Sequence, residues 1–262
     1  MITSDQVTVI IPCFNSQSYI SRAVESVLRQ SCVPGKILLI DDNSTDNTLE
    51  LLRQIQKSNP HANFQVVKNL QNVGPGLTRN YGWDISETDW IAFLDSDDAW
   101  HRNKLEIQIR VLNEYPDLSL IGTQTAFAIS IDQESFSNKN FHLTRLSFQR
   151  LLFRNIVPTR SVMLRRNIPL RFPSGLSEDY ALWLEALYSG MHFGKIEAPL
   201  AFHFREEFSS GGLSAALVKH ELYELKRLSK YLPSYPVRVT LAMFFSLLKF
   251  IRRVLLRLYR SL

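Results

Sequence analysis

The chain has 262 residues, of which 45% are hydrophobic and 21% are charged, and its formal net charge is +5. This length can bury a complete core, and this composition excludes a disordered or low-complexity protein. Cys13 and Cys32 lack metal-ligand spacing, which argues against a disulfide scaffold and suits a reducing cytoplasm. Residues 1–6 lead directly into a strand pattern with no secretion signal, so we expect a cytoplasmic protein.

The positive charge is concentrated in two segments that contain no acidic residue. Residues 237–262 carry six cations, so the rest of the chain has a net charge of −1, and residues 135–177 carry eight more. The remainder is therefore acidic, at about −9. This segregation predicts an acidic, metal-binding half and a basic half that meets phosphates or an anionic surface.

Strand and helix patterns alternate along the first half of the chain. Short apolar runs predict strands at 7–12, 36–40, 64–67 and 90–94. Apolar residues at helical spacing predict helices at 18–30, 45–58 and 77–86. Such alternation indicates an α/β fold with a mostly parallel central sheet flanked by helices. A helix at 104–115, a strand at 118–127 and a helix with Ser177 as its N-cap follow.

Three carboxylates, Asp95, Asp97 and Asp98, directly follow the strand at 90–94. Like charges this close cost free energy when they are desolvated, so the cluster predicts a divalent cation. Oxygen ligands favour Mg²⁺ or Mn²⁺ over Zn²⁺, and Mg²⁺ is often shared with substrate phosphates. A nucleoside diphosphate is therefore the predicted partner, and a solvated acidic turn is the alternative.

Polar residues also follow the first two predicted strands. Asn15 follows the first and Asp41 and Asp42 follow the second, and open parallel sheets bind ligands at the carboxyl ends of their strands. These acids either accept hydrogen bonds from a nucleobase or a ribose hydroxyl, or only begin a turn and cap the next helix. After the glycine turn at 74–76, Arg79 either points at the base or phosphates or is solvated on its helix.

Glu178 and Asp179 form a second acidic motif at the start of a predicted helix. Both charges suit the helix macrodipole, which is the simpler interpretation. A hydroxyl that attacks an activated sugar gains from a carboxylate that accepts its proton. Asp179 is the predicted general base.

Five runs carry a resemblance to a known family: 7–15, 41–48, 72–80, 93–98 and 177–179. In this order and spacing they resemble the inverting glycosyltransferase family 2, which has the GT-A nucleotide-sugar fold, over about the first 210 residues. The resemblance implies nucleotide contacts by Pro12, Asn15, Asp42, Arg79 and Asp95. It implies a metal and pyrophosphate site at Asp95 and Asp97 and a catalytic base at Asp179. It also implies a single displacement with inversion, in which Mn²⁺ or Mg²⁺ neutralises the diphosphate leaving group.

A looser similarity concerns the region after residue 200. It implies His203 as a metal ligand and Arg205 as a phosphate clamp, with ordinary surface residues as the alternative. The chain lacks the Gln-x-x-Arg-Trp motif and the membrane spans of processive relatives. We therefore expect the addition of a single sugar.

The last 26 residues, 237–262, predict a basic amphipathic helix. Its longest uncharged run, 239–248, is too short to span a bilayer, which takes about 20 residues. One stripe is cationic, with Lys249, Arg252, Arg253, Arg257 and Arg260, and another is apolar, with Leu248, Ile251, Leu255, Leu258 and Leu262. Together with Phe244, Phe245 and Phe250, this pattern suits the headgroup layer of an anionic membrane. A helix packed on the body or on a partner subunit is the alternative, and no nucleic-acid-binding module accompanies the cations.

Together these features predict a nucleotide-sugar-binding half at 1–105, an acceptor-binding and catalytic half at 106–215 and a helical tail at 216–262. The expected function is transfer of one sugar from a nucleotide diphosphate sugar, with UDP favoured, to a hydroxyl of a lipid-linked glycan. A lipopolysaccharide, O-antigen or exopolysaccharide precursor at the inner face of a bacterial plasma membrane fits this acceptor. A non-catalytic nucleotide-sugar-binding scaffold and a nucleotidyltransferase are the competing functions, and the oligomeric state is open.

Overall fold

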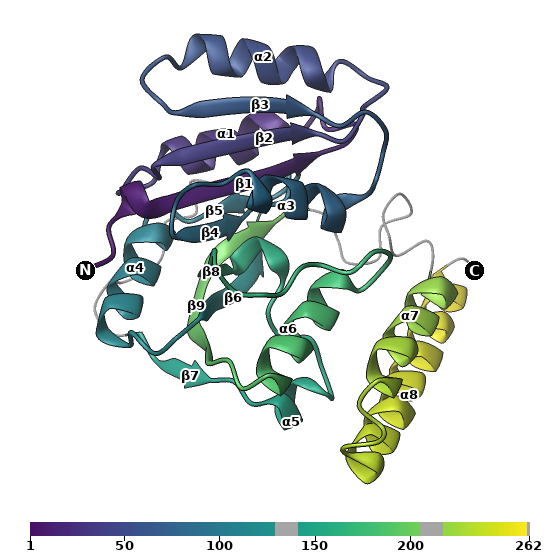
Figure 1. Ribbon diagram of the computed structural model, residues 1–262. Coiled ribbons are helices and arrows are strands. Elements are labelled where there is room, and N and C mark those ends of the chain that lie inside the picture. The colour runs from purple at the N-terminus through teal and green to yellow at the C-terminus, as the bar shows by residue number, and fades with distance from the viewer. Residues whose placement is uncertain (129–140, 205–216, 261–262) are drawn as a thin grey trace.

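One mixed α/β sheet organises the molecule (Figure 1). The structure is a computed structural model that describes residues 1–128, 141–204 and 217–260, without the side chains of 257–260. Within these residues nine strands form a single sheet in the order β3-β2-β1-β4-β8-β6-β9-β5, with β7 paired to β9. The predicted α/β fold with a mostly parallel central sheet is confirmed.

The first four strands are parallel and are linked by helices. The strands are β1 (Val7–Cys13), β2 (Lys36–Asp41), β3 (Phe64–Lys68) and β4 (Trp90–Phe93). The helices are α1 (Ile20–Leu28), α2 (Thr48–Ser58) and α3 (Pro75–Asp84), and a short 3-10 helix, η1 (Ser4–Gln6), precedes β1. The chain winds outward from β1 to β3 and then returns to place β4 on the other side of β1. The strand order therefore reverses between β1 and β4, which is where open α/β sheets bind ligands.

Alternating side chains of these strands pack into two separate apolar clusters, one on each face of the sheet. Side chains along a strand point to opposite faces, so Val9 and Ile11 of β1 pack in one apolar cluster and Ile10 packs in the other. The first cluster includes residues of α1, α2 and α4 (Lys104–Glu114), and the second includes residues of α3 and α6 (Glu178–Tyr188). Helices thus cover both faces, which explains why β1, β2 and β4 are mostly apolar.

The second half of the chain adds strands that the sequence analysis did not anticipate. They are β5 (Ala99–Trp100), β7 (Leu143–Arg145), β8 (Met163–Arg165) and β9 (Phe193–His203), in addition to the expected β6 (Leu120–Phe127). Two short helices, α5 (Phe148–Leu151) and η2 (Thr159–Ser161), connect them. β8 is antiparallel to β4 and β6, and β5 is antiparallel to the end of β9. The strand pair β5–β9 brings the end of β9 next to the segment that follows β4.

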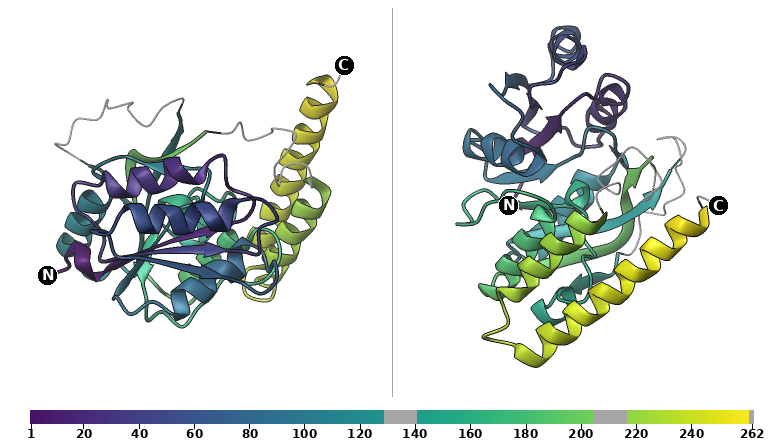
Figure 2. Two further views of the ribbon diagram at one scale, coloured as in Figure 1. Left: turned by 90° about the horizontal axis from the view of Figure 1, so that it is seen from above. Right: turned by 90° about the vertical axis from the view of Figure 1, so that its right-hand side faces the viewer.

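The C-terminal region is a hairpin of two helices, α7 (Leu217–Ser229) and α8 (Pro236–Arg260), where the sequence predicted one. The two helices run side by side along one flank of the molecule, far from β3 and α2 (Figures 1 and 2). Tyr231, Val239 and Ala242 are buried in the second core cluster, so the hairpin is packed on the body. Among the described residues, no helix is both long enough and apolar enough to cross a membrane.

Candidate active site

The acidic cluster lies where β4 ends, beside the end of β1. The Leu94 amide still donates to the carbonyl of Ile10 at 3.1 Å, and the chain then turns, with the Asp98 amide donating to the Asp95 carbonyl at 3.1 Å. Ser96 reaches across the strand-order reversal, because its hydroxyl lies 2.8 Å from that of Ser16, which follows β1. The predicted convergence of the segments after β1 and β4 is thus present.

Asp98 is the buried member of the acidic cluster, with 3% exposure. Arg160 Nη1 donates to its Oδ2 at 3.0 Å. Burial raises the pKa of Asp98 to about 8; Arg160 opposes this rise, whereas the charges of Asp95 and Asp97 add to it. Burial is thus the main reason why Asp98 holds its proton more tightly than an ordinary aspartic acid.

Arg79 joins the two acidic motifs. Its guanidinium is buried, with Nη2 paired to Asp95 Oδ1 and Nη1 paired to Glu178 Oε1 at 3.1 Å. Burial raises the pKa of Glu178, Asp179 raises it further, and Arg79 opposes the rise. The sequence interpretation of Arg79 as pointing at a base or phosphates did not include these carboxylate partners. Arg79 connects α3, the end of β4 and the start of α6, and its contact with a base or phosphates stays a prediction.

Asp179 is half-buried next to Glu178 and is held by three donors. Asn155 Nδ2 and Thr159 Oγ1 donate to its Oδ2 at 3.1 and 3.2 Å, and the Tyr180 amide donates to Oδ1 at 2.6 Å. These contacts fix the orientation of the carboxylate at the first turn of α6. Neither Asn155 nor Thr159 was recognised from the sequence, because nothing in the basic stretch distinguishes them.

Ser177 occupies the predicted N-cap position of α6, but it does not cap the helix through its side chain. Its backbone is left-handed, with φ of +54°, and its hydroxyl lies 3.3 Å from a ring nitrogen of His220 in α7. Gly175, two residues earlier, is also left-handed, with φ of +91°. A non-glycine residue with positive φ is strained, and such residues cluster at functional sites.

The segment after β1 is tied to the segment after β2. Asn15 has φ of +48°, and its Oδ1 accepts from the Thr45 amide at 2.9 Å. Pro12 lies buried inside β1, opposite Ile40 of β2. α2 begins at Thr48, not at the predicted residue 45, because Asp46 Oδ1 accepts from the Thr48 amide at 2.9 Å and ends the turn there.

Asp42 is buried, and both oxygens of its carboxylate accept hydrogen bonds. Oδ1 accepts from Asn69 Nδ2 and the Val73 amide at 2.7 and 3.0 Å, and Oδ2 accepts from the Gly74 amide at 2.8 Å. The acid thereby fixes the loop that leads into α3. Its contact with a nucleobase or ribose stays a prediction, as do the nucleotide contacts of Pro12 and Asn15.

His203 ends β9, one residue beyond the pairing of Phe202 with Ala99 in β5. This register brings it to the edge that follows the acidic cluster, and its ring packs at 5.7 Å from that of Phe127. In the described part of the chain, no group of three or more His, Cys, Asp or Glu side chains could hold a metal ion. His203 as a metal ligand therefore stays a prediction, and Arg205 lies outside the described residues.

Asp95 and Asp97 nevertheless suit a metal that substrate phosphates help to hold. Mg²⁺ binds through one or two carboxylates together with phosphates, so a three-residue protein site is not required. Arg79 pairs with Oδ1 of Asp95, which leaves Oδ2 of that carboxylate outside the pair. An oxygen-only donor set of this charge fits Mn²⁺ or Mg²⁺.

Two further arginines contact the acidic cluster and were missed by the sequence analysis. Arg160 pairs with Asp98, and Arg22 Nη2 donates to the Asp97 carbonyl at 2.6 Å with its guanidinium 3.6 Å from the Phe204 ring centre. The segregation of charge was the available signal for Arg160, since it belongs to the basic stretch 135–177. Arg22 gave no signal, because a cation on a predicted helix is ordinary.

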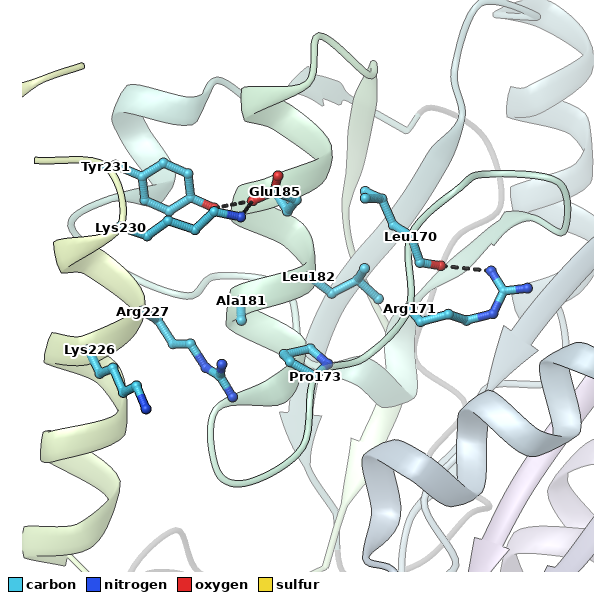
Figure 3. A pocket seen from close by; sticks show the side chains of 10 residues that line it. All are labelled: Leu170, Arg171, Pro173, Ala181, Leu182, Glu185, Lys226, Arg227, Lys230 and Tyr231. Carbon is cyan, nitrogen blue, oxygen red and sulfur yellow. Dashed lines mark hydrogen bonds and ion pairs between the residues drawn. The ribbon is translucent and has the colours of Figure 1, made fainter. Parts of the chain in front are cut away.

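A separate cavity of about 360 Å³ lies between α6, α7 and the segment 170–173 (Figure 3). Its lining includes four cations, Arg171, Lys226, Arg227 and Lys230. Glu185 compensates part of this charge, because it pairs with Lys230 and accepts from the Tyr231 hydroxyl at 2.8 Å. None of the predicted site residues lines this cavity. It lies where the α7–α8 hairpin meets α6.

Comparisons with known proteins show the family of the chain. The family model described as glycosyl transferase family 2 matches residues 8–172. The UDP-Glc:alpha-D-GlcNAc-diphosphoundecaprenol beta-1,3-glucosyltransferase WfgD of Escherichia coli is 31% identical over 183 residues, which cover 69% of this chain and 69% of WfgD. The chain therefore belongs to glycosyltransferase family 2 and is a glycosyltransferase.

Solved structures share the fold. The crystal structure of S. aureus TarS in complex with UDP-GlcNAc superimposes with a TM-score of 0.68 at 18% identity, covering 94% of this chain and 72% of that one. The mannosyltransferase PcManGT of Pyrobaculum calidifontis, in complex with GDP-Man and Mn²⁺, gives 0.67 at 15% identity and covers 92% of this chain and 72% of that one. The GT-A fold implied by the sequence resemblance is thus confirmed.

Proposed function

We propose that this glycosyltransferase moves one sugar from a UDP-sugar to a hydroxyl of a lipid-linked glycan, with inversion at the anomeric carbon. The observation that carries the proposal is the Arg79 bridge, which holds Asp95 and Glu178 on one guanidinium. It brings the proposed diphosphate and metal end of the site together with Asp179, the neighbour of Glu178. The name of WfgD, with UDP-Glc as donor and a diphosphoundecaprenol-linked acceptor, supports this choice of substrates.

In the proposed reaction Asp179 accepts the proton of the attacking hydroxyl. The hydroxyl oxygen forms a bond to the anomeric carbon from the face opposite the nucleotide, and the bond from that carbon to the diphosphate oxygen breaks, with its electron pair leaving on UDP. Asn155 and Thr159 hold the Asp179 carboxylate in one orientation for this step. A general base of this kind contributes about 10²- to 10⁴-fold in rate.

Asp95 and Asp97 are the proposed ligands of Mn²⁺ or Mg²⁺, which supplies positive charge to the departing diphosphate when bound. The complex of PcManGT with GDP-Man and Mn²⁺ supports a divalent ion. His203 and Arg205 are proposed as a further ligand and a phosphate clamp. The residues proposed to contact the nucleotide are Pro12, Asn15, Asp42, Arg79 and Asp95.

The remaining proposals concern location and organisation. We place the enzyme at the inner face of a bacterial plasma membrane, acting on a precursor of lipopolysaccharide, O-antigen or exopolysaccharide. Residues 1–105 would bind the donor, 106–215 the acceptor, and 216–262 the membrane surface. The acceptor in WfgD's name supports a membrane location, since that acceptor is itself a lipid.

The test is an assay of glucose transfer from UDP-glucose to an N-acetylglucosamine diphospho-lipid with Mn²⁺ present. The quantities measured are the release of UDP and the anomeric configuration of the product. We expect a β-linked product, and we expect Asp179→Asn to lower kcat by about 10²- to 10⁴-fold while UDP binding persists. Asp117→Asn is the matched control, because Asp117 is exposed and pairs only at the surface with Arg145 and His192. Release of pyrophosphate instead of UDP, or full activity of Asp179→Asn, would contradict the proposal.

A further inference from the structure

α8 exposes an apolar face on the side opposite the one that packs against the body. Val239, Ala242 and Ser246 are buried along the packed side. At 100° per residue the opposite side carries six apolar side chains, each between 45% and 71% exposed: Val237, Leu241, Phe244, Leu248, Ile251 and Leu255. Phe245, Leu247 and Leu256 extend it on both sides and are more than 40% exposed. A contiguous apolar surface of this extent marks an interaction site.

Some cations of α8 are bound to other parts of the protein, and others are exposed to solvent. Lys249 donates through Nζ to the Phe153 carbonyl, and Arg253 pairs at 2.9 Å with the buried Glu221 of α7. These two cations serve the hairpin. Arg238 and Arg252 are exposed beside the apolar face, and neither forms an ion pair with a described residue. Arg257 and Arg260, which the sequence interpretation also assigned to the cationic stripe, have no described side chains.

The charge and the width of the apolar face distinguish between two partners, a second copy of the chain and a lipid surface. The six central residues are spaced four and three apart, which is also the pattern of a coiled-coil seam between two copies. A seam of that kind is stabilised by opposite charges at its borders, but residues 236–262 contain no acid, so two copies would bring cation against cation. The face is also wider than a seam, because Phe245, Leu247 and Leu256 extend it. A broad apolar face with cations along one edge and no acid in its helix suits the interface of an anionic bilayer.

We propose that the outward face of α8, centred on Phe244 and Leu248 and bordered by Arg238 and Arg252, docks on an anionic lipid surface. The proposal deepens the proposed function, since a lipid-linked acceptor requires the active site to lie beside a bilayer, but the surface itself is independent of the transfer chemistry. It also changes the stripe expected from sequence. Lys249 and Arg253 face the body, and Phe250 is half-buried. Phe244 and Phe245 are exposed as expected, and the exposed apolar residues begin seven residues before Phe244, at Val237.

The experiment uses the full chain and sedimentation with vesicles of phosphatidylcholine, with and without phosphatidylglycerol. Deleting α8 would expose the core at Val239 and Ala242, so point variants are preferable. We expect wild type to bind only the anionic vesicles. Phe244→Asp/Leu248→Asp should lose binding, and Arg238→Gln/Arg252→Gln should weaken it about 30-fold, from about 1 kcal/mol per cation.

Matched controls alter exposed side chains of the same kinds elsewhere in the molecule. Leu70→Asp, in the loop after β3, and Arg53→Gln/Lys57→Gln, on α2, should bind vesicles like wild type. Each variant is also assayed for donor turnover in detergent, so that loss of docking with retained turnover separates this surface from the proposed function. Equal binding to neutral vesicles, or binding that survives Phe244→Asp/Leu248→Asp, would overturn the proposal. A dimer in solution that this double variant dissociates, with no vesicle binding by wild type, would overturn it in favour of a second copy.

Discussion

Arg79 is the residue on which the geometry of the site depends. Its side chain is 5% exposed, and those of its partners Asp95 and Glu178 are 25% and 13% exposed. A buried ion pair adds little net stability over apolar groups of the same shape, but the loss of one partner leaves an uncompensated charge. Arg79 therefore acts as a positioning residue for two acids from different elements.

Arg79→Met should destabilise the fold by about 3 kcal/mol, the lower end of the range for broken buried pairs because Asp95 keeps some solvent contact. Adding Glu178→Gln should recover part of this loss, since it removes one of the two stranded charges. Urea unfolding of the single and double variants measures both effects. Arg171→Met is the control, because its pair with Asp84 is exposed and should contribute at most about 1 kcal/mol. A double variant less stable than Arg79→Met would contradict this account.

Lys104 predicts a pH dependence of stability. The side chain is fully buried, Nζ donates to Gln108 Oε1 at 2.7 Å, and burial lowers the pKa well below the ordinary 10.5. Above its lowered pKa the folded lysine is neutral, whereas the unfolded lysine keeps its proton up to about 10.5. The unfolded state then binds more protons, so this group makes stability rise with pH in that interval.

Lys104→Met should remove this rise. Urea midpoints measured from neutral to alkaline pH give the slope for wild type, for Lys104→Met and for Lys57→Met, an exposed lysine on α2 that serves as control. The methionine variant should show the flatter dependence and the Lys57 variant should follow wild type. An unchanged slope in Lys104→Met would show that the buried amine stays protonated.

At the scale of elements, burial decided what could be predicted. β1 to β4 were predicted to within one residue at each end, because strands covered on both faces are mostly apolar. The edge strand β3, with Gln65 and Lys68, is the most exposed of the four. β8 has three residues, and β9 contains Gly194, Pro199 and two charged residues, so neither carries a strand pattern of its own. Their strand state follows from their neighbours in the sheet. The Arg79–Glu178 pair joins positions 99 apart, and local sequence cannot predict such a contact.

The α7–α8 hairpin also depends on a buried acid. Glu221 is 3% exposed, Arg253 is its ion-pair partner among the described residues, and Oε1 of Glu221 has no hydrogen bond. Arg253→Leu should leave this carboxylate uncompensated and make amide hydrogen exchange in α8 about 100-fold faster, the equivalent of about 3 kcal/mol. Arg238→Leu, an exposed cation of the same helix, should leave exchange unchanged. Glu221→Gln/Arg253→Leu should slow exchange relative to Arg253→Leu alone; equal rates would exclude a stranded charge as the cause.

At the scale of the whole molecule, the two basic segments have different surroundings. The stretch 135–177 contributes Arg160 to the acidic cluster, so part of its charge is used inside the candidate site. The last 26 residues carry six cations, and Arg238 and Arg252 border an apolar surface on the outside. The charge segregation read from the sequence thus corresponds to two places in the fold, one inside the site and one on the flank.

This separation predicts that salt affects vesicle binding and donor turnover differently. Exposed charges lose their interaction once the Debye length, about 10 Å at 0.1 M salt, falls to about 3 Å at 1 M, whereas partly buried pairs are screened much less. Raising salt should therefore release the protein from anionic vesicles while donor turnover in detergent falls by less than about threefold, because the Arg160–Asp98 pair is largely buried. Co-sedimentation with vesicles and UDP release, measured over the same series of salt concentrations, check the two parts of this prediction. Parallel loss of binding and turnover would mean that the flank and the site are not independent, and salt-insensitive binding would remove Arg238 and Arg252 from the docking surface.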